Sequence, residues 1–545
     1  MREPMTGWAS SVTVDGIEWK ASGTGGGVAT GGRAAASAGI RMLEQGGCAA
    51  DAAAATLLAL SITDYGCYAI GGEIPLIVYD AAVREVKVLC GLGGAPLDQS
   101  AMDWYYENRI PSQGSIKAAP VPGAVSLCVA VIQHYGTMSF EQVVAPSLAL
   151  LDAGGQDWYA RLAATFRRLI ETERATPGTR EEKLQAARDR FYKGDVADDL
   201  VAFYTREGGF LRKPDLVAHT TRIEDPVSVQ YRGYTVCKCD SWTQGPYLCQ
   251  ALRLLEGFDL REMGHLSADY IHTVTEALKL AMADRDEYYG DPLLVDVPMQ
   301  ELLSDRYTEL RRPLIDMGKA SMTARPGDPI HMRALKGPGT LDPGPGGTTT
   351  CVVADRWGNM VAATPSGNGP YAVCRELGVA HGNRLRSLNT TPGHPNRIEP
   401  GKRPRITLTP TLVLREGRAV IAISVAGGDL QDQTTLNLLL NHIEFGMMPD
   451  EAVTAPRFST GHHQDSFNPD PRRRKAICDL GSLNVDVAVN QHTLKRLADR
   501  GHRVKTADEP IGAPAMLLFD HSSGLIHVAG DPSAARHVAA LEAET

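Results

Sequence analysis

The stretch of residues 322–347 limits the fold of this chain more than any other segment. It reads "MTARPGDPIHMRALKGPGTLDPGPGG". Proline removes a backbone donor and fixes one dihedral angle, and glycine disfavours both helix and strand, so no regular structure is expected here. The β-branched run "TTTCVV" follows directly. The sequence therefore has its strongest boundary signal at residues 322–347, an irregular tether that leads into a strand.

The two parts differ in the secondary structure that they predict. Ala-rich runs near the start indicate buried helices, and residues 139–289 read as mostly helical. The part after the tether instead predicts three hairpins, which turn at Trp357–Gly358–Asn359, at Glu416–Gly417 and within residues 513–532. Helices combined with several hairpins indicate an α+β fold with a largely antiparallel sheet.

Composition narrows the classes of partner. The chain has 545 residues and a formal net charge of −9, and this acidic balance argues against nucleic-acid binding. The apolar run at residues 49–62 is too short and too Ala-rich to span a membrane. No apolar core follows a basic start at the N-terminus, so a secretory leader is not expected and a cytoplasmic protein is predicted.

No metal or other cofactor is expected from the motifs. The ten cysteines are scattered, which suits reduced core residues better than a disulfide framework. Cys237 and Cys239 lie in a strand-like run without a second Cys/His pair at zinc spacing, and His462–His463 reads as a loop pair. The Gly-rich loop before residue 33 lacks a phosphate-binding motif, so its small residues more simply allow close helix packing.

Two features after the tether suggest acyl chemistry. The pair Gly427–Gly428 ends a strand and precedes a helix, which Asp429 or Asp432 is expected to cap. Such a turn exposes backbone N–H groups that can stabilise an oxyanion, although these residues alone favour a plain tight turn. Thr348 can act as a nucleophile if cleavage after Gly347 frees its α-amine to serve as the base. A loop that feeds a strand is the alternative.

At this point the sequence resembles the γ-glutamyltranspeptidases, which belong to the N-terminal-nucleophile hydrolases. The matching segments run in order through most of the chain, among them "ASAGIRMLEQGGCAADAAAA", "GGEIPLIVYD", "GTTTCVVADRWGNMVA", "GKRPRITLTPTLVL" and "VAGGDLQDQTTLNLLLNHIEFG". The resemblance implies a four-layer αββα sandwich. It also implies autocatalytic cleavage into a large fragment, residues 1–347, and a small fragment, residues 348–545, which remain together as one core.

The resemblance also implies roles for individual residues. Asp355 and Gly358–Asn359 hold the family's spacing, which places the nucleophile at Thr348 rather than at Thr349, Thr350 or Cys351. Thr348 would attack an amide carbonyl, with its own amine relaying the proton, and form an acyl-enzyme. The remaining matches are Ser366, a hydroxyl beside the nucleophile; Asn368, a substrate-binding residue; and Gly427 with Gly428, the oxyanion pair.

This chain departs from the family where the charges of a glutamyl group are bound. Leu92 stands where the family has an Arg for the α-carboxylate, and Ser387 stands where it has an Asp for the α-amine. Ile406 and Thr407 replace a hydroxyl pair, and Thr350 replaces a His. Arginines lie nearby in the sequence, of which Arg384 and Arg386 would suit an acidic acyl group without an α-amine, for example a glutaryl group; the others are Arg375, Arg403 and Arg405.

Thr348, Ser366, Gly427 and Gly428 are therefore the predicted catalytic residues, with Asn368, Arg384, Arg386 and Thr407 predicted to bind a small-molecule amide. Two rival hypotheses remain: a true γ-glutamyltransferase or glutathione hydrolase, and an inactive, unprocessed family member that acts as a binding scaffold. A homodimer of the two-fragment unit is left open.

Overall fold

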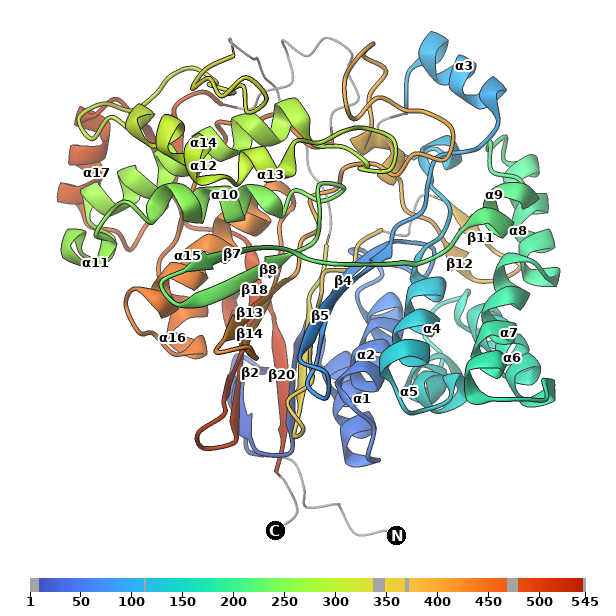
Figure 1. The fold of residues 1–545 in the computed structure, drawn as a ribbon. Helices are drawn as coiled ribbons and strands as arrows, with labels where there is room; N and C mark the ends of the chain where they lie inside the picture. The colour runs from blue at the N-terminus through green and yellow to red at the C-terminus, as the bar shows by residue number, and fades with distance from the viewer. Residues whose placement is uncertain (1–8, 112–113, 337–347, 368–371, 468–478, 543–545) are drawn as a thin grey trace.

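The computed structural model describes residues 9–111, 114–336, 348–367, 372–467 and 479–542 (Figure 1). It contains both helices and largely antiparallel sheets, which confirms the predicted α+β class. A seven-stranded sheet has the order β20 (His537–Leu541), β3 (Gly26–Thr30), β9 (Cys351–Asp355), β10 (Met360–Ala363), β4 (Ile74–Asp80), β5 (Glu85–Gly91) and β6 (Arg222–Glu224).

A second sheet of eight strands packs against the first. Its order is β1 (Val12–Val14), β2 (Ile17–Gly23), β19 (Leu525–Gly530), β18 (Ala513–Asp520), β14 (Arg418–Ala426), β13 (Thr411–Arg415), β8 (Tyr234–Lys238) and β7 (Val227–Tyr231). In Figure 1 the strands occupy the middle of the molecule, and helices flank them on both sides.

The alternation of side chains along the strands explains this layering. In β9, Cys351 and Val353 join the core under the helices, whereas Val352 and Ala354 join the core between the two sheets. β14 alternates in the same way between the inter-sheet core and the other helical layer. Because both faces of each sheet are apolar, each sheet needs a partner on both sides, which gives the four-layer sandwich.

Each helical layer covers one sheet. The seven-stranded sheet is covered chiefly by α1 (Arg33–Glu44), α2 (Ala49–Thr63), α4 (Ala124–Tyr135) and α5 (Phe140–Asp152). The eight-stranded sheet is covered chiefly by α10 (Pro246–Leu255), α12 (Ala268–Tyr288), α15 (Gln431–Ile443) and α16 (Pro449–Thr454). Among the described residues, none of the helices is both long and apolar enough to cross a bilayer.

Small residues let the first two helices approach closely, as the sequence predicts. A Cβ atom on Gly39 of α1 would lie 2.4 Å from Thr56 Oγ1 of α2, so a larger residue would force the helices apart. Glycines 26 and 27, read from the sequence as part of a loop, belong to strand β3 instead. They fit there because a Cβ on Gly27 would meet side chains of the opposing sheet.

The predicted hairpins form where the sequence places them. β9 pairs with β10 around Gly358, β13 pairs with β14 around Glu416–Gly417, and β18 pairs with β19. Glu416 and Gly417 both have positive φ, the backbone conformation that two-residue hairpin turns require. β9 lies between β3 and β10, and β10 pairs with β4, so segments from both sides of the tether build one sheet.

Candidate active site

Three side chains from distant parts of the sequence lie in a row at one end of the seven-stranded sheet. Thr348 and Ser366 are antiparallel bridge partners, and Ser366 is also the bridge partner of Glu73. Glu73 and Ser366 exchange both backbone N–H···O bonds, each 3.0 Å long. Directly opposed residues of an antiparallel pair share a face and lie about 5 Å apart, so the three side chains line one face.

Arg384 ties this row together. Its Nε donates to Glu73 Oε1 at 2.5 Å, and its Nη2 donates to Ser366 Oγ at 2.7 Å. The guanidinium also stacks over the ring of Phe467, 5.2 Å from the ring centre. Arg384 and the three side chains of the row are all buried. Arg384 is thus an ion-paired residue rather than the free cation that the sequence suggests, although its Nη1 has no partner within the described part of the chain.

Sequence reasoning missed two members of this cluster. Glu73 was quoted only as part of a matching segment, yet a carboxylate before the apolar strand "IPLIVY" is a signal in itself, because buried charges need partners. Phe467 carried no signal in the sequence. Its ring lies beneath the guanidinium groups of both Arg384 and Arg386, and a Cβ on Gly428 would be 3.3 Å from it.

Phe467 therefore connects the arginines with the glycine turn. Gly427 (φ 142°) and Gly428 (φ 59°) end β14 and precede α15, in conformations that other residues rarely adopt. The turn forms as predicted, and its role in stabilising an oxyanion stays a prediction. The predicted helix cap is wrong, because Asp429 pairs with Arg285 at 2.6 Å and Asp432 pairs with Lys238 at 2.7 Å.

Thr349, the residue after Thr348, is anchored separately. Thr349 Oγ1 donates to Asp64 Oδ2 at 2.6 Å and accepts from Arg536 Nη1 at 3.2 Å. A Cβ atom on Gly31 would lie 2.1 Å from that carboxylate oxygen, so only glycine fits beside the network. Thr350 is held through its carbonyl oxygen, which accepts from Thr30 Oγ1 at 2.8 Å.

Two cysteines lie near the three threonines, and neither is a suitable nucleophile. Cys351 is fully buried in the core under the helices, and burial raises the pKa of its thiol far above the usual range. Cys67 lies near Thr348 and Asp64. Burial, with Asp64 nearby, raises the pKa of Cys67 as well. A buried neutral thiol attacks poorly, which favours a threonine hydroxyl at this site.

The other sequence-predicted residues are distributed around the same region. Leu92 is buried in the apolar core between the sheets, and Thr407 is buried with no partner for its hydroxyl in the described ranges. Ser387 is likewise buried with an unpartnered hydroxyl. Among the nearby arginines, Arg403 and Arg405 are buried and Arg375 is exposed. Gly347 and Asn368 lie outside the described residues.

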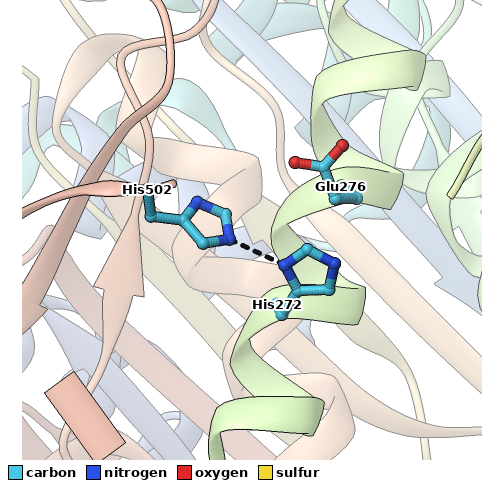
Figure 2. Close-up of side chains that lie close together, drawn as sticks. All are labelled: His272, Glu276 and His502. Atoms are coloured by element: carbon cyan, nitrogen blue, oxygen red, sulfur yellow. Dashed lines mark hydrogen bonds between the residues drawn. The ribbon is translucent and has the colours of Figure 1, made fainter. Parts of the chain in front are cut away.

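One group of side chains elsewhere has metal-ligating chemistry. His272, Glu276 and His502 place a ligand atom each within 4.8 Å of one another (Figure 2). The two imidazoles share a hydrogen bond of 2.8 Å, and Glu276 is ion-paired with both Lys279 and Arg325. The two adjacent cations would repel a metal ion, and the Glu276 carboxylate is already ion-paired with them. We therefore assign the group a structural role.

Comparison with known proteins agrees with this geometry. The family model for gamma-glutamyltranspeptidase matches residues 35–184 and 159–541. The chain belongs to the γ-glutamyltranspeptidase family. A glutathione hydrolase proenzyme of Bacillus subtilis (strain 168) is 27% identical over 94% of this chain and 90% of its own length. An acylase ACY 1 proenzyme of Pseudomonas sp. (strain SE83) is 29% identical, over 92% of this chain and 91% of its own.

Solved structures share the fold. The structure of LmbA2991HD superposes with a TM-score of 0.86 at 30% identity, covering 97% of this chain and 99% of that one. A cephalosporin acylase from Bacillus halodurans gives a TM-score of 0.80 at 24% identity over the full length of both chains, which shows the fold alone.

Membership of this family establishes the class of activity. The γ-glutamyltranspeptidase-like relatives are proenzymes of hydrolases and acylases. The chain is therefore an enzyme of the N-terminal-nucleophile class, an autoprocessed amidohydrolase or acyltransferase. Its precursor is cleaved into a large and a small fragment, and its substrate is a small molecule.

Proposed function

We propose that Thr348 is the nucleophile and that the enzyme cleaves a small amide through a threonyl acyl-enzyme. The observation that carries this proposal is the row in which Thr348 lies opposite Ser366, with Arg384 hydrogen-bonded to Ser366 Oγ. A hydroxyl held beside the nucleophile and a glycine turn nearby supply the donors that acyl transfer needs.

The chemistry follows from cleavage between residues 347 and 348. The freed α-amine of Thr348 has an ordinary pKa of about 7.7–8.0, so it can act as a base near neutral pH. It takes the hydroxyl proton as Oγ adds to the amide carbonyl, and it returns a proton to the leaving amine as the C–N bond breaks. Water then cleaves the ester to release an acid, or an acceptor amine takes the acyl group instead.

We propose further that the acyl group is not γ-glutamyl. Leu92 and Ser387 replace the charged residues with which the family binds the glutamate head, and loss of a charged partner weakens binding of a charged ligand. Arg384 Nη1 is a buried donor without a partner among the described residues, and the Arg386 guanidinium lies over the same Phe467 ring, 4.7 Å from its centre. A carboxylate-bearing acyl group without an α-amine, such as glutaryl, fits these donors.

A gel and a substrate panel test the proposal. Wild-type protein should separate into fragments of about 37 and 21 kDa, in proportion to 58.6 kDa for the whole chain, and Thr348→Ala should remain intact and inactive. Glutaryl-p-nitroanilide should react faster than γ-glutamyl-p-nitroanilide, with uncharged valeryl-p-nitroanilide as the control for the carboxylate.

Each other outcome identifies a rival. A preference for the γ-glutamyl compound would indicate a true glutathione hydrolase or γ-glutamyltransferase and would overturn the proposed acyl group. An uncleaved wild-type chain with no activity on any of the three compounds would indicate a binding scaffold. Equal rates for the valeryl and glutaryl compounds would show that the arginines do not bind the carboxylate of the acyl group.

A further inference from the structure

Thr349, the neighbour of the nucleophile, is held by two charged side chains that the proposed mechanism does not use. We propose that Asp64 is a positioning residue that, together with Arg536, holds the Thr349 hydroxyl and thereby keeps Thr348 in place once self-cleavage has made it a chain end. This inference rests on the proposed role of Thr348 and on cleavage directly before it.

The strand pairing beside the nucleophile cannot be complete. The bridge between Thr348 and Ser366 continues the register in which β9 pairs with β10. In that register Thr349 lies opposite Pro365, and its N–H donates to the carbonyl oxygen of Pro365 at 3.0 Å. Proline has no N–H to return, so the second hydrogen bond that such a pair normally makes cannot form. The backbone of β10 therefore restrains Thr349 through one hydrogen bond instead of two.

Side chains supply a further restraint at this point. Thr349 Oγ1 donates to Asp64 Oδ2 at 2.6 Å and accepts from Arg536 Nη1 at 3.2 Å, so the hydroxyl is fixed from two sides. Both partners are charged, which strengthens the two hydrogen bonds. Their side chains are only 15% and 11% exposed. A Cβ atom on Gly31 would lie 2.3 Å from Thr349 Oγ1, so the end of β3 closes a third side.

A fixed Thr349 also determines which way Thr348 faces. Thr349 and Cys351 point toward the helical layer, where Asp64 ends α2. Consecutive residues of an extended chain point to opposite faces, so Thr348 points toward the other sheet. The strand β14 and its glycine turn belong to that sheet. The contact with Asp64 therefore keeps the hydroxyl of Thr348, rather than that of Thr349, on the side of the predicted oxyanion hole.

Cleavage makes this restraint more important. In the precursor, peptide bonds continue the chain on both sides of Thr348. After cleavage Thr348 is connected on one side only, and chain ends fray unless they are tied down. Asp64 belongs to the large fragment, whereas Thr349 and Arg536 belong to the small one, so their contact ties the new terminus to the other fragment. The restraint should therefore matter more for turnover than for self-cleavage.

Removal of the Thr349 hydroxyl tests this role. In Thr349→Val the shape is kept but the hydrogen bonds to two charged groups are lost, so kcat of the processed enzyme should fall at least about tenfold. KM for glutaryl-p-nitroanilide should change less than about twofold, because the arginines proposed to bind the acyl group are untouched. The rate of self-cleavage, followed on gels, should change less than about threefold. Thr349→Ser keeps the hydroxyl, so its kcat should stay within about twofold of wild type.

Two further variants keep the result interpretable. Thr350→Val removes the next buried hydroxyl, which has no partner in the portion of the chain that the structure covers, and should leave kcat unchanged. Asp64→Ala removes the acceptor without altering residues beside the nucleophile. It should lower kcat in the same way even if Thr349→Val proves too unstable to purify. The double variant of Asp64→Ala and Thr349→Val should be no slower than the slower single variant, because both act through one hydrogen bond.

The failure of this inference is distinct from the failure of the proposed function. If wild type is active and Thr349→Val lowers kcat and self-cleavage by the same factor, or lowers only the melting temperature, the contact is structural and the inference is wrong. It is also wrong if the losses from Asp64→Ala and Thr349→Val multiply in the double variant. If Thr348→Ala is cleaved and active, the proposed function itself fails.

Discussion

The three consecutive threonines at residues 348–350 have three different environments. Thr348 faces Ser366, Thr349 is hydrogen-bonded to Asp64 and Arg536, and the hydroxyl of Thr350 has no partner in the part of the chain that the structure describes. In the proposed mechanism Thr348 reacts, whereas Thr349 is held by its hydroxyl and Thr350 by its carbonyl oxygen. The three threonines thus differ in their contacts, and only Thr348, which the register selects, lies opposite Ser366.

The different hydroxyl contacts of Thr349 and Thr350 predict that substitutions at these two positions have different effects on stability. Thr349→Val leaves the buried Arg536 and the partly buried Asp64 without their shared hydroxyl, so the free energy of unfolding should fall by about 1–3 kcal/mol. Thr350→Val replaces a buried hydroxyl that has no partner, so stability should be unchanged or slightly higher. Urea denaturation of both variants in the unprocessed Thr348→Ala background would measure the difference, and equal losses would contradict it.

At the scale of elements, the glycine turn before α15 combines a strained backbone with a position beside the site. Gly428 has φ 59° and lies against Phe467, whereas Gly417 has φ 74° in an open hairpin turn with nothing within 4 Å of its Cβ position. Both substitutions to alanine put a side chain on a left-handed residue, which costs about 1 kcal/mol.

The two glycines therefore separate strain from function. Gly428→Ala and Gly417→Ala should lower the melting temperature by similar amounts, but only Gly428→Ala should lower kcat, because it alone displaces the backbone N–H groups of the predicted oxyanion hole. Steady-state kinetics with thermal melts of both proteins would check this. Equal kcat values for the two variants would argue that the turn is purely structural.

Local pattern was enough to predict the elements that carry the site. The hairpins around Gly358 and Glu416–Gly417 follow from turn residues between β-branched runs, and the strand-to-helix turn follows from Gly427–Gly428. The helix cap at Asp429 or Asp432 was wrong, because a long-range ion pair competes with the local cap for each carboxylate. Propensity describes the neighbours in sequence and cannot weigh a buried Arg285 or Lys238.

The resemblance placed Ser366 beside Thr348, but the presence of Glu73 in their row was beyond prediction for the same reason. The members of the row come from the ends of β4, β10 and β9, and only the register of the seven-stranded sheet brings them together. Nothing in the sequence near residue 73 indicates that its carboxylate will meet the guanidinium of Arg384. The contact with Phe467 depends equally on tertiary packing.

At the scale of the whole molecule, buried histidines should make the fold sensitive to acid. His462 and His502 lie beside Lys279 and close to Arg325 or Arg500, in the layer behind the eight-stranded sheet. Burial, reinforced by these cations, lowers the pKa of His462 to about 3 and that of His502 to about 2. Both imidazoles are therefore neutral in the folded protein well below the pKa of about 6.5 that they have when unfolded.

The sign of the effect follows from proton binding. Below pH 6.5 the histidines of the unfolded chain bind protons, whereas those of the folded chain stay neutral. The free energy of unfolding should therefore be highest with respect to these two histidines above pH 6.5, and it should fall as the pH drops toward 3. Each such histidine contributes up to about 1.4 kcal/mol per pH unit in that window.

His462→Gln removes one of these two histidines and keeps a side-chain oxygen that can accept from the Gly481 N–H. Urea denaturation between pH 7 and pH 4.5 should therefore give a shallower loss of stability for His462→Gln than for wild type. The exposed substitution His134→Gln should leave the slope unchanged, and parallel slopes for all three proteins would show that the buried histidines do not set the acid limit of the fold.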